Sequence, residues 1–196
     1  MRKLVNILVI TLLCASTESS LGVDVAPEIT VENDDFEVLL STSSRAISCF
    51  NKPSQFYVIL KNKTNESKRL FEYWNSWGYQ NISFLFHVSG ETRLVTRKHL
   101  DFTRNFPSTY EIPSGEVIVF PIIFDQWWHE LPNIAEGESK VNIQIVYECK
   151  PSVESEESKV WTGTVSSKVY EVVFWRAHSD TLKFKADSGE SAAGKE

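Results

Sequence analysis

Apolar and polar side chains alternate along several short segments of this chain. The clearest case is residues 139–149, where every second residue from Val141 to Tyr147 is apolar. Alternate residues of a β-strand lie on the same face, so this pattern predicts a strand with one buried face. Similar alternation, or a short apolar run between turn residues, predicts further strands at 36–42, 55–62, 81–89, 91–98, 108–112, 116–124, 159–165 and 168–175.

Turn residues separate these segments. Ser89-Gly90 predicts a hairpin turn between 81–89 and 91–98. In Pro113-Ser114-Gly115, Pro and Gly suit the second and fourth positions of a type I turn. Ser166-Ser167 separates the last two strands, which we expect to form a final pair. Sustained helical periodicity is missing, and the best helix candidate is the short stretch 71–75.

Eight or nine short strands without interleaved helices indicate an all-β protein. We expect a single antiparallel immunoglobulin-like β-sandwich over residues 36–178, with a closed barrel as the alternative. The total of 196 residues fits one such domain. The acidic segment 151–158 is expected to be an exposed hairpin loop. The tail 179–196 ends in ten residues without a large apolar side chain, so we expect disorder there.

The first 22 residues have the pattern of a secretory signal peptide. A basic start is followed by the apolar run 4–13 and then by small residues. The run is too short to span a bilayer, so no transmembrane segment is expected in the mature chain. Cleavage near residues 16–22 would leave an acidic arm, 23–35, and a secreted or periplasmic protein. A lipid anchor at Cys14 is disfavoured, because the preceding Leu13 is large.

Two cysteines, Cys49 and Cys149, would remain after removal of the signal peptide. An even number of cysteines in an exported protein favours a disulfide. Both lie in step with the apolar positions of predicted strands, so both thiols are expected to point inward. The alternative is two buried free thiols, which pack as small hydrophobic groups.

Charge and motifs argue against several functions. Lys and Arg number 20 and Asp and Glu 26, a net charge of −6, which disfavours nucleic acid as a partner. The chain contains no Gly-x-Ser-x-Gly, no glycine-rich phosphate loop and no His-Glu-x-x-His, and its four His residues are scattered. We therefore expect no catalytic residue, no metal and no cofactor, and a noncatalytic protein.

Aromatic side chains gather in two segments that lie outside the predicted strands or at their ends. Their neighbours are Asn, Gln, Asp and Ser, and Trp and Tyr are typical of binding surfaces. We expect them to bind a protein or carbohydrate at the cell envelope, and a carbohydrate site predicts a planar exposed ring pair. The alternative is that the rings fill the ends of the sandwich, with one ring of the adjacent tryptophan pair buried and the other exposed. The candidate ligand-binding residues are Trp74, Trp77, Tyr79, Trp127 and Trp128.

Arg93 and Arg97 share one face of the predicted strand 91–98. They form a basic face that could recognise a carboxylate or a sulfated sugar. The alternative is a solvated strand face balanced by nearby acidic residues. Three Asn-x-Ser/Thr triplets begin at Asn62, Asn65 and Asn81 and would be glycosylated only in a host that modifies exported proteins.

Two segments carry a resemblance to a known family. The strand and Asn-rich turn of 57–67 resemble those of bacterial immunoglobulin-like sandwiches, and 110–116 resembles a turn of the same domains. Their order is similar to that in BsuPI-type proteinase-inhibitor domains. The resemblance implies an inhibitor that inserts an exposed loop, 62–68 or 100–107, into a protease. Segments 69–79 and 102–107 also resemble parts of uncharacterised secreted bacterial proteins. A purely structural envelope module is a further alternative.

Overall fold

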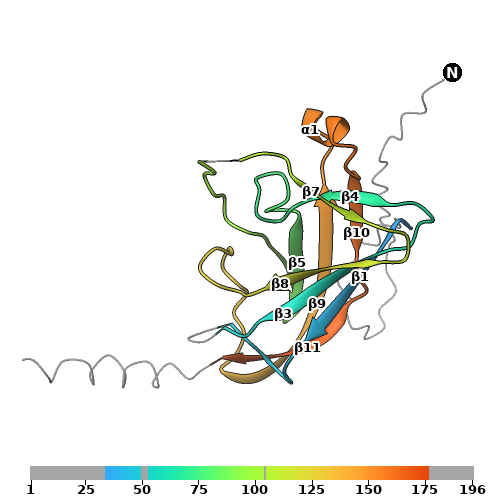
Figure 1. Ribbon diagram of the computed structural model, residues 1–196. Helices are drawn as coiled ribbons and strands as arrows, with labels where there is room; N and C mark the ends of the chain where they lie inside the picture. Colours follow the sequence, from blue (N-terminus) through green and yellow to red (C-terminus); the bar gives the residue numbers. More distant parts are fainter. Residues whose placement is uncertain (1–33, 50–52, 104, 177–196) are drawn as a thin grey trace, which may run out of the picture.

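The computed structural model describes residues 34–49, 53–103 and 105–176. The predicted signal peptide, Cys14, all but the last two residues of the acidic arm, and the predicted tail lie outside these described residues. The described chain forms β-sheets, and its elements are drawn in Figure 1.

A three-stranded antiparallel sheet forms one layer of the molecule, in the strand order β1-β3-β8. A separate antiparallel pair, β4 and β7, lies below α1 in the view of Figure 1. Polar residues break the alternation between β3 and β4, and Asn62 ends β3 in a turn. The bounds of these strands are β1 Phe36–Thr42, β3 Phe56–Asn62, β8 Val117–Ile122, β4 Lys68–Phe71 and β7 Thr109–Ile112.

The second layer is a larger sheet in the order β2-β11-β9-β5-β6, with β10 also paired to β9. Its pairs are antiparallel except for the parallel pair β2–β11. The 13-residue strand β9 is its central member. The bounds are β2 Ile47–Ser48, β5 Ile82–Val88, β6 Glu91–Val95, β9 Gly137–Cys149, β10 Gly163–Ser166 and β11 Tyr170–Arg176.

The hydrophobic core lies between the two layers. Val58 and Leu60 of β3 are fully buried, as are Ile143 and Ile145 of β9. Rings also meet across the layers: the centroids of Phe56 and Phe84 are 5.7 Å apart, close to edge-on. Side chains from both inner faces therefore form one core, as in a sandwich. The predicted fold class, an all-β antiparallel sandwich, is confirmed.

All nine predicted strands are present within a few residues of their predicted ends. The short strands β2 and β4 are additional. The predicted helix at 71–75 is wrong, because this stretch leaves β4 and continues as turns. Instead, a five-residue helix, α1 (Val153–Glu157), lies inside the predicted acidic loop between β9 and β10. The Ser152 hydroxyl accepts a hydrogen bond from the Ser155 amide, which caps this helix.

The turns follow the predictions only in part. Ser89 and Gly90 both have positive φ, the conformation of a tight hairpin turn, and join β5 to β6. In the 113–116 turn the Glu116 amide donates to the Pro113 carbonyl, so Gly115, with φ +75°, is at the third position rather than the fourth.

The expected pairing of the last two strands is also corrected. β10 and β11 do not pair with each other; both pair with β9, one after the other along it. Ser167 lies between them, and its hydroxyl accepts a hydrogen bond from the Ile145 amide at 2.9 Å. A side-chain oxygen therefore takes the place of a ladder partner where the two strands are interrupted.

Candidate functional site

Residues 72–81 form a compact coil that presents the first aromatic segment. Asn75 is fully buried at its centre: its Oδ1 accepts from the Gly78 amide at 2.9 Å, and its Nδ2 donates to the Ser108 carbonyl at 2.9 Å. Gly78 packs against the chain at the end of β4, and a Cβ there would lie 2.3 Å from the Glu72 carbonyl oxygen. A buried amide and a close backbone contact therefore both help to hold the coil.

Only one of the three predicted binding residues in this coil is exposed. Trp74 is 41% exposed, whereas Tyr79 is buried and Trp77 is half-buried, packed on Phe71 with ring centroids 6.1 Å apart. The coil folds back on itself, so Trp77 and Tyr79 face the interior. The burial of Tyr79 and the packing of Trp77 against the core agree with the alternative that these rings fill the end of the sandwich.

The exposed Trp74 ring has a partner that the sequence prediction did not include. Phe106, 60% exposed, lies edge-to-face against Trp74, with centroids 5.2 Å apart and planes at 73°. The pair forms a corner and not the planar platform that was expected. Phe106 follows β6 by a long loop, and no local sequence pattern places it beside Trp74.

Polar groups hold the Trp74 ring and the segment next to Phe106. The Trp74 indole N–H donates to the Glu72 carboxylate, and the Ser108 hydroxyl donates to the same carboxylate oxygen at 2.8 Å. Beside them the Ser76 amide donates to Asn105 Oδ1 at 3.1 Å, which ties the coil to the chain next to Phe106. The corner of Trp74 and Phe106, with Glu72 and Asn105 beside it, is named the aromatic corner.

The second aromatic segment divides as expected for the adjacent pair. Trp127 is 43% exposed, and Trp128 is 3% exposed and packs on Phe124 and Phe84. Backbone hydrogen bonds tie this segment to the chain just beyond β6: the Lys98 amide donates to the Trp127 carbonyl at 2.7 Å, and the His129 amide donates to the Thr96 carbonyl at 2.9 Å. Trp128 is therefore part of the core, and Trp127 is a single exposed ring.

The two arginines of the predicted basic face, Arg93 and Arg97, lie in different environments. The Arg97 guanidinium lies over the rings of Tyr79 and Trp128, 4.8 and 4.9 Å from their centroids. Such cation–π contacts give Arg97 a structural role between the two aromatic segments. Arg93 instead pairs with Glu130, Nη2 to Oε2 at 3.7 Å, and lines a pocket.

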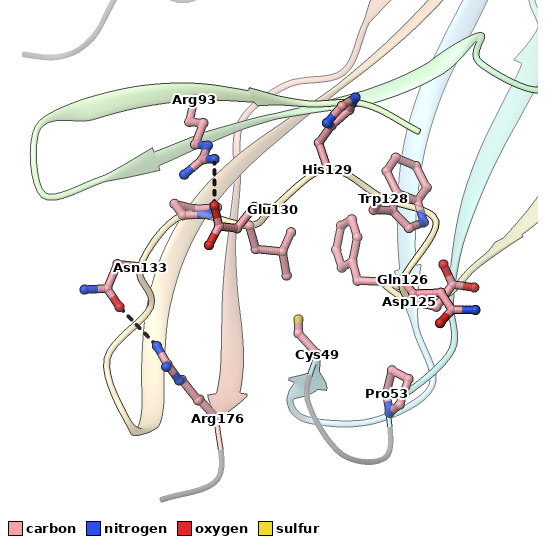
Figure 2. A pocket seen from close by; sticks show the side chains of 13 residues that line it. Cys49, Pro53, Arg93, Asp125, Gln126, Trp128, His129, Glu130, Asn133 and Arg176 are labelled. Atoms are coloured by element: carbon pink, nitrogen blue, oxygen red, sulfur yellow. Dashed lines mark hydrogen bonds and ion pairs between the residues drawn. The ribbon is translucent and has the colours of Figure 1, made fainter. Parts of the chain in front are cut away.

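This pocket lies beside β6, under the segment that follows β8 (Figure 2). Its volume of about 670 Å³ is in the range of small-molecule sites. It brings together three residues that the sequence assigned to separate roles, Cys49, Arg93 and Trp128. The other lining residues are Pro53, Phe124, Asp125, Gln126, His129, Glu130, Leu131, Pro132, Asn133 and Arg176.

The predicted disulfide between Cys49 and Cys149 is wrong: both are buried free thiols. Cys49 follows Ser48, which lies beside Trp175, and Trp175 is opposite Glu138 near the start of β9. Cys149 ends β9, 11 residues further on, or roughly 36 Å at about 3.3 Å per residue. A disulfide needs Cα atoms within about 7 Å. Burial raises the pKa of Cys49 to about 12 and that of Cys149 to about 11.

The first of the three Asn-x-Ser/Thr triplets begins at an asparagine whose side chain is bonded inside the fold. Asn62 is fully buried, and its Nδ2 donates to the carbonyls of Glu66, Ile112 and Pro113 at 2.7, 2.9 and 3.1 Å. Its Oδ1 accepts from the amide and the hydroxyl of Thr64. Asn65 is exposed and Asn81 is half-buried.

Comparison with known proteins leaves the family open: the chain matches no family model and no curated protein. Across residues 34–49, 53–103 and 105–176, no helix is long and apolar enough to cross a membrane. Within the same ranges, no three His, Cys, Asp or Glu side chains gather in a way that could hold a metal ion.

Proposed function

We propose that this chain is an exported, noncatalytic binding module of the cell envelope that contacts its ligand through the aromatic corner. The observation that supports the proposal is the exposed pair of Trp74 and Phe106, which come from separate segments. Two large rings exposed side by side form an apolar patch, and such patches often mark the place where a partner binds.

The ligand that fits the corner best is a terminal sugar residue. The apolar face of a sugar can lie on one ring while the second ring covers its edge, because the two planes meet at 73°. Glu72 and Asn105 provide a carboxylate and an amide beside the rings, the groups that bind sugar hydroxyls. Hydrogen bonds to Ser108 and Ser76 orient both groups, so little ordering is needed on binding.

The experiment is a glycan panel titrated against the purified chain and followed by tryptophan fluorescence. Trp74→Ala and Phe106→Ala should each weaken the binding of a responding glycan at least tenfold. Trp127→Ala is the matched control, since Trp127 is equally exposed but lies outside the corner. The proposal fails if no glycan binds, or if the control loses as much affinity as Trp74→Ala.

A second candidate function is protease inhibition, suggested by the resemblance to BsuPI-type domains. The observation that favours it is the fixed turn at 63–67, where the buried Asn62 side chain holds the chain through carbonyl and amide hydrogen bonds. Inhibitory loops bind best when they are ordered before binding. Titration against serine, cysteine and metalloproteases tests this candidate, and no inhibition in any class would remove it.

Export is proposed from the basic and apolar pattern of residues 1–22. A fusion of these residues to a reporter that is active only outside the cytoplasm tests it. N-terminal sequencing of the exported product should then give a start between residues 17 and 23. An inactive reporter would contradict export.

A further inference from the structure

The pocket beside β6 has an apolar floor that belongs to the core. Phe124 and Trp128 are each 3% exposed, and their ring centroids lie 5.3 Å apart. Leu131 and the Cys49 thiol extend the apolar surface, and Figure 2 shows the sulfur pointing into the pocket. This floor is rigid and favours the apolar part of a ligand.

Arg93 brings a positive charge to the edge of this floor. In β6 it is directly opposite Phe86 of β5, which is fully buried, and therefore lies on the inner face of the sheet. Its ion pair with Glu130 is long, at 3.7 Å, and the Glu130 side chain is 88% exposed. Exposed ion pairs are weak, so a ligand anion can replace Glu130 at low cost.

Arg176 adds a second guanidinium to the lining. Its Nη1 donates to Asn133 Oδ1 and to the Ile134 carbonyl, both at 3.0 Å, and these bonds fix the group. In Figure 2, Arg93 and Arg176 come from different strands to the side of the pocket that carries Glu130 and Asn133, while Asp125 and Gln126 lie on the opposite side. The pocket therefore has a cationic side and an apolar floor.

We propose that this pocket binds an anionic amphiphile, namely a carboxylate on an apolar body. The carboxylate replaces Glu130 on Arg93, and the guanidinium of Arg176 adds to the positive potential at that side. The apolar body covers Phe124, Trp128 and Leu131. This inference is independent of the aromatic corner, since none of these residues belongs to it.

The test compares decanoate with decanol, which has the same chain length and no charge, by calorimetric titration into the full chain. Decanoate should bind at least tenfold more tightly than decanol. Arg93→Gln should weaken decanoate about tenfold and leave decanol unchanged. Arg69→Gln is the matched control, because Arg69 forms a similar exposed pair with Glu111 on β4 and β7 and does not line this pocket.

Glu130→Gln should have the opposite effect to Arg93→Gln: it should strengthen decanoate binding. A variant that merely damaged the fold would not bind more tightly. Removal of the competing carboxylate should tighten decanoate several-fold, while decanol binding stays constant. Equal affinities for decanoate and decanol, no binding of either, or weaker decanoate binding by Glu130→Gln would each overturn the proposal. Trp74→Ala should leave decanoate binding intact, so the two ligand proposals fail separately.

Discussion

At the scale of single residues, buried polar side chains hold the loops of this protein. Asn62, Asn75 and Ser167 are buried, and each bonds to backbone groups of a distant segment. Arg97 acts in a similar way through its contacts with the rings of Tyr79 and Trp128. Buried polar groups of this kind are costly when their partners are removed, so stability should depend strongly on a few of them.

Asn62→Ala should lower the free energy of unfolding by about 2–4 kcal/mol, since the carbonyls of Glu66, Ile112 and Pro113 lose their shared donor. Asn65→Ala, three residues further along in the exposed turn, is the control and should change it by less than about 0.5 kcal/mol. Urea unfolding measures both variants. A similar small effect of the two substitutions would show that the Asn62 hydrogen bonds contribute little.

At the scale of elements, alternation in the sequence predicted the strands but not what joins them. Alternation and short apolar runs are local properties, and together they mark nine segments. The coil at 72–81 has no such signal, because it is shaped by Asn75 and by the contact of Gly78 with the backbone of Glu72. Asn75 also donates to the Ser108 carbonyl, 33 residues further on, which comes beside the coil because β4 pairs with β7.

Gly78→Ala should disturb this coil, because the added Cβ would clash with the Glu72 carbonyl at 2.3 Å. Such overpacking costs about 1–3 kcal/mol, and near-ultraviolet circular dichroism should change as Trp74 and Trp77 move. Gly90→Ala is the comparison: its φ of +83° adds strain of about 1 kcal/mol, but its Cβ meets open space. An unchanged aromatic spectrum for Gly78→Ala would contradict the role given to this contact.

At the scale of the whole molecule, the alternation of residues along each strand showed which side chains point inward. It did not show where along the sandwich they lie. Cys49 and Cys149 are both buried, as the alternation predicts, yet they lie at opposite ends of β9. Arg93 and Arg97 were predicted to share a strand face, but Arg93 lies in β6 and Arg97 lies beyond its end at Val95, and the two have different partners. The pocket escaped prediction for the same reason, because its residues come from four separate parts of the chain.

The two buried thiols, one at each end of the sandwich, should make the stability of the fold depend on pH in the alkaline range. Burial raises the pKa of Cys49 from its ordinary 9.0 to about 12 and that of Cys149 to about 11. The folded state keeps these protons while the unfolded chain loses them, so stability is full below about pH 9 and falls as the pH rises toward 11–12. The loss approaches about 1.4 kcal/mol per pH unit for each thiol.

The measurement is the urea midpoint between pH 8 and 10.5. The variant Cys49→Ala/Cys149→Ala should show a flatter decline, whatever its stability at pH 8. Burial also raises the pKa of Tyr147, which adds a decline that remains in the variant. Equal slopes in the two proteins would mean that the thiols do not carry the effect.

The parallel pairing of β2 with β11 has a kinetic consequence. It joins Ile47 to Phe174, which are 127 positions apart in the chain, and β11 also completes one edge of β9. The larger sheet therefore cannot be completed until nearly all of the described chain has left the ribosome. Pairings of such long range slow folding to milliseconds or longer, so this sheet forms only after most of the chain has been synthesised.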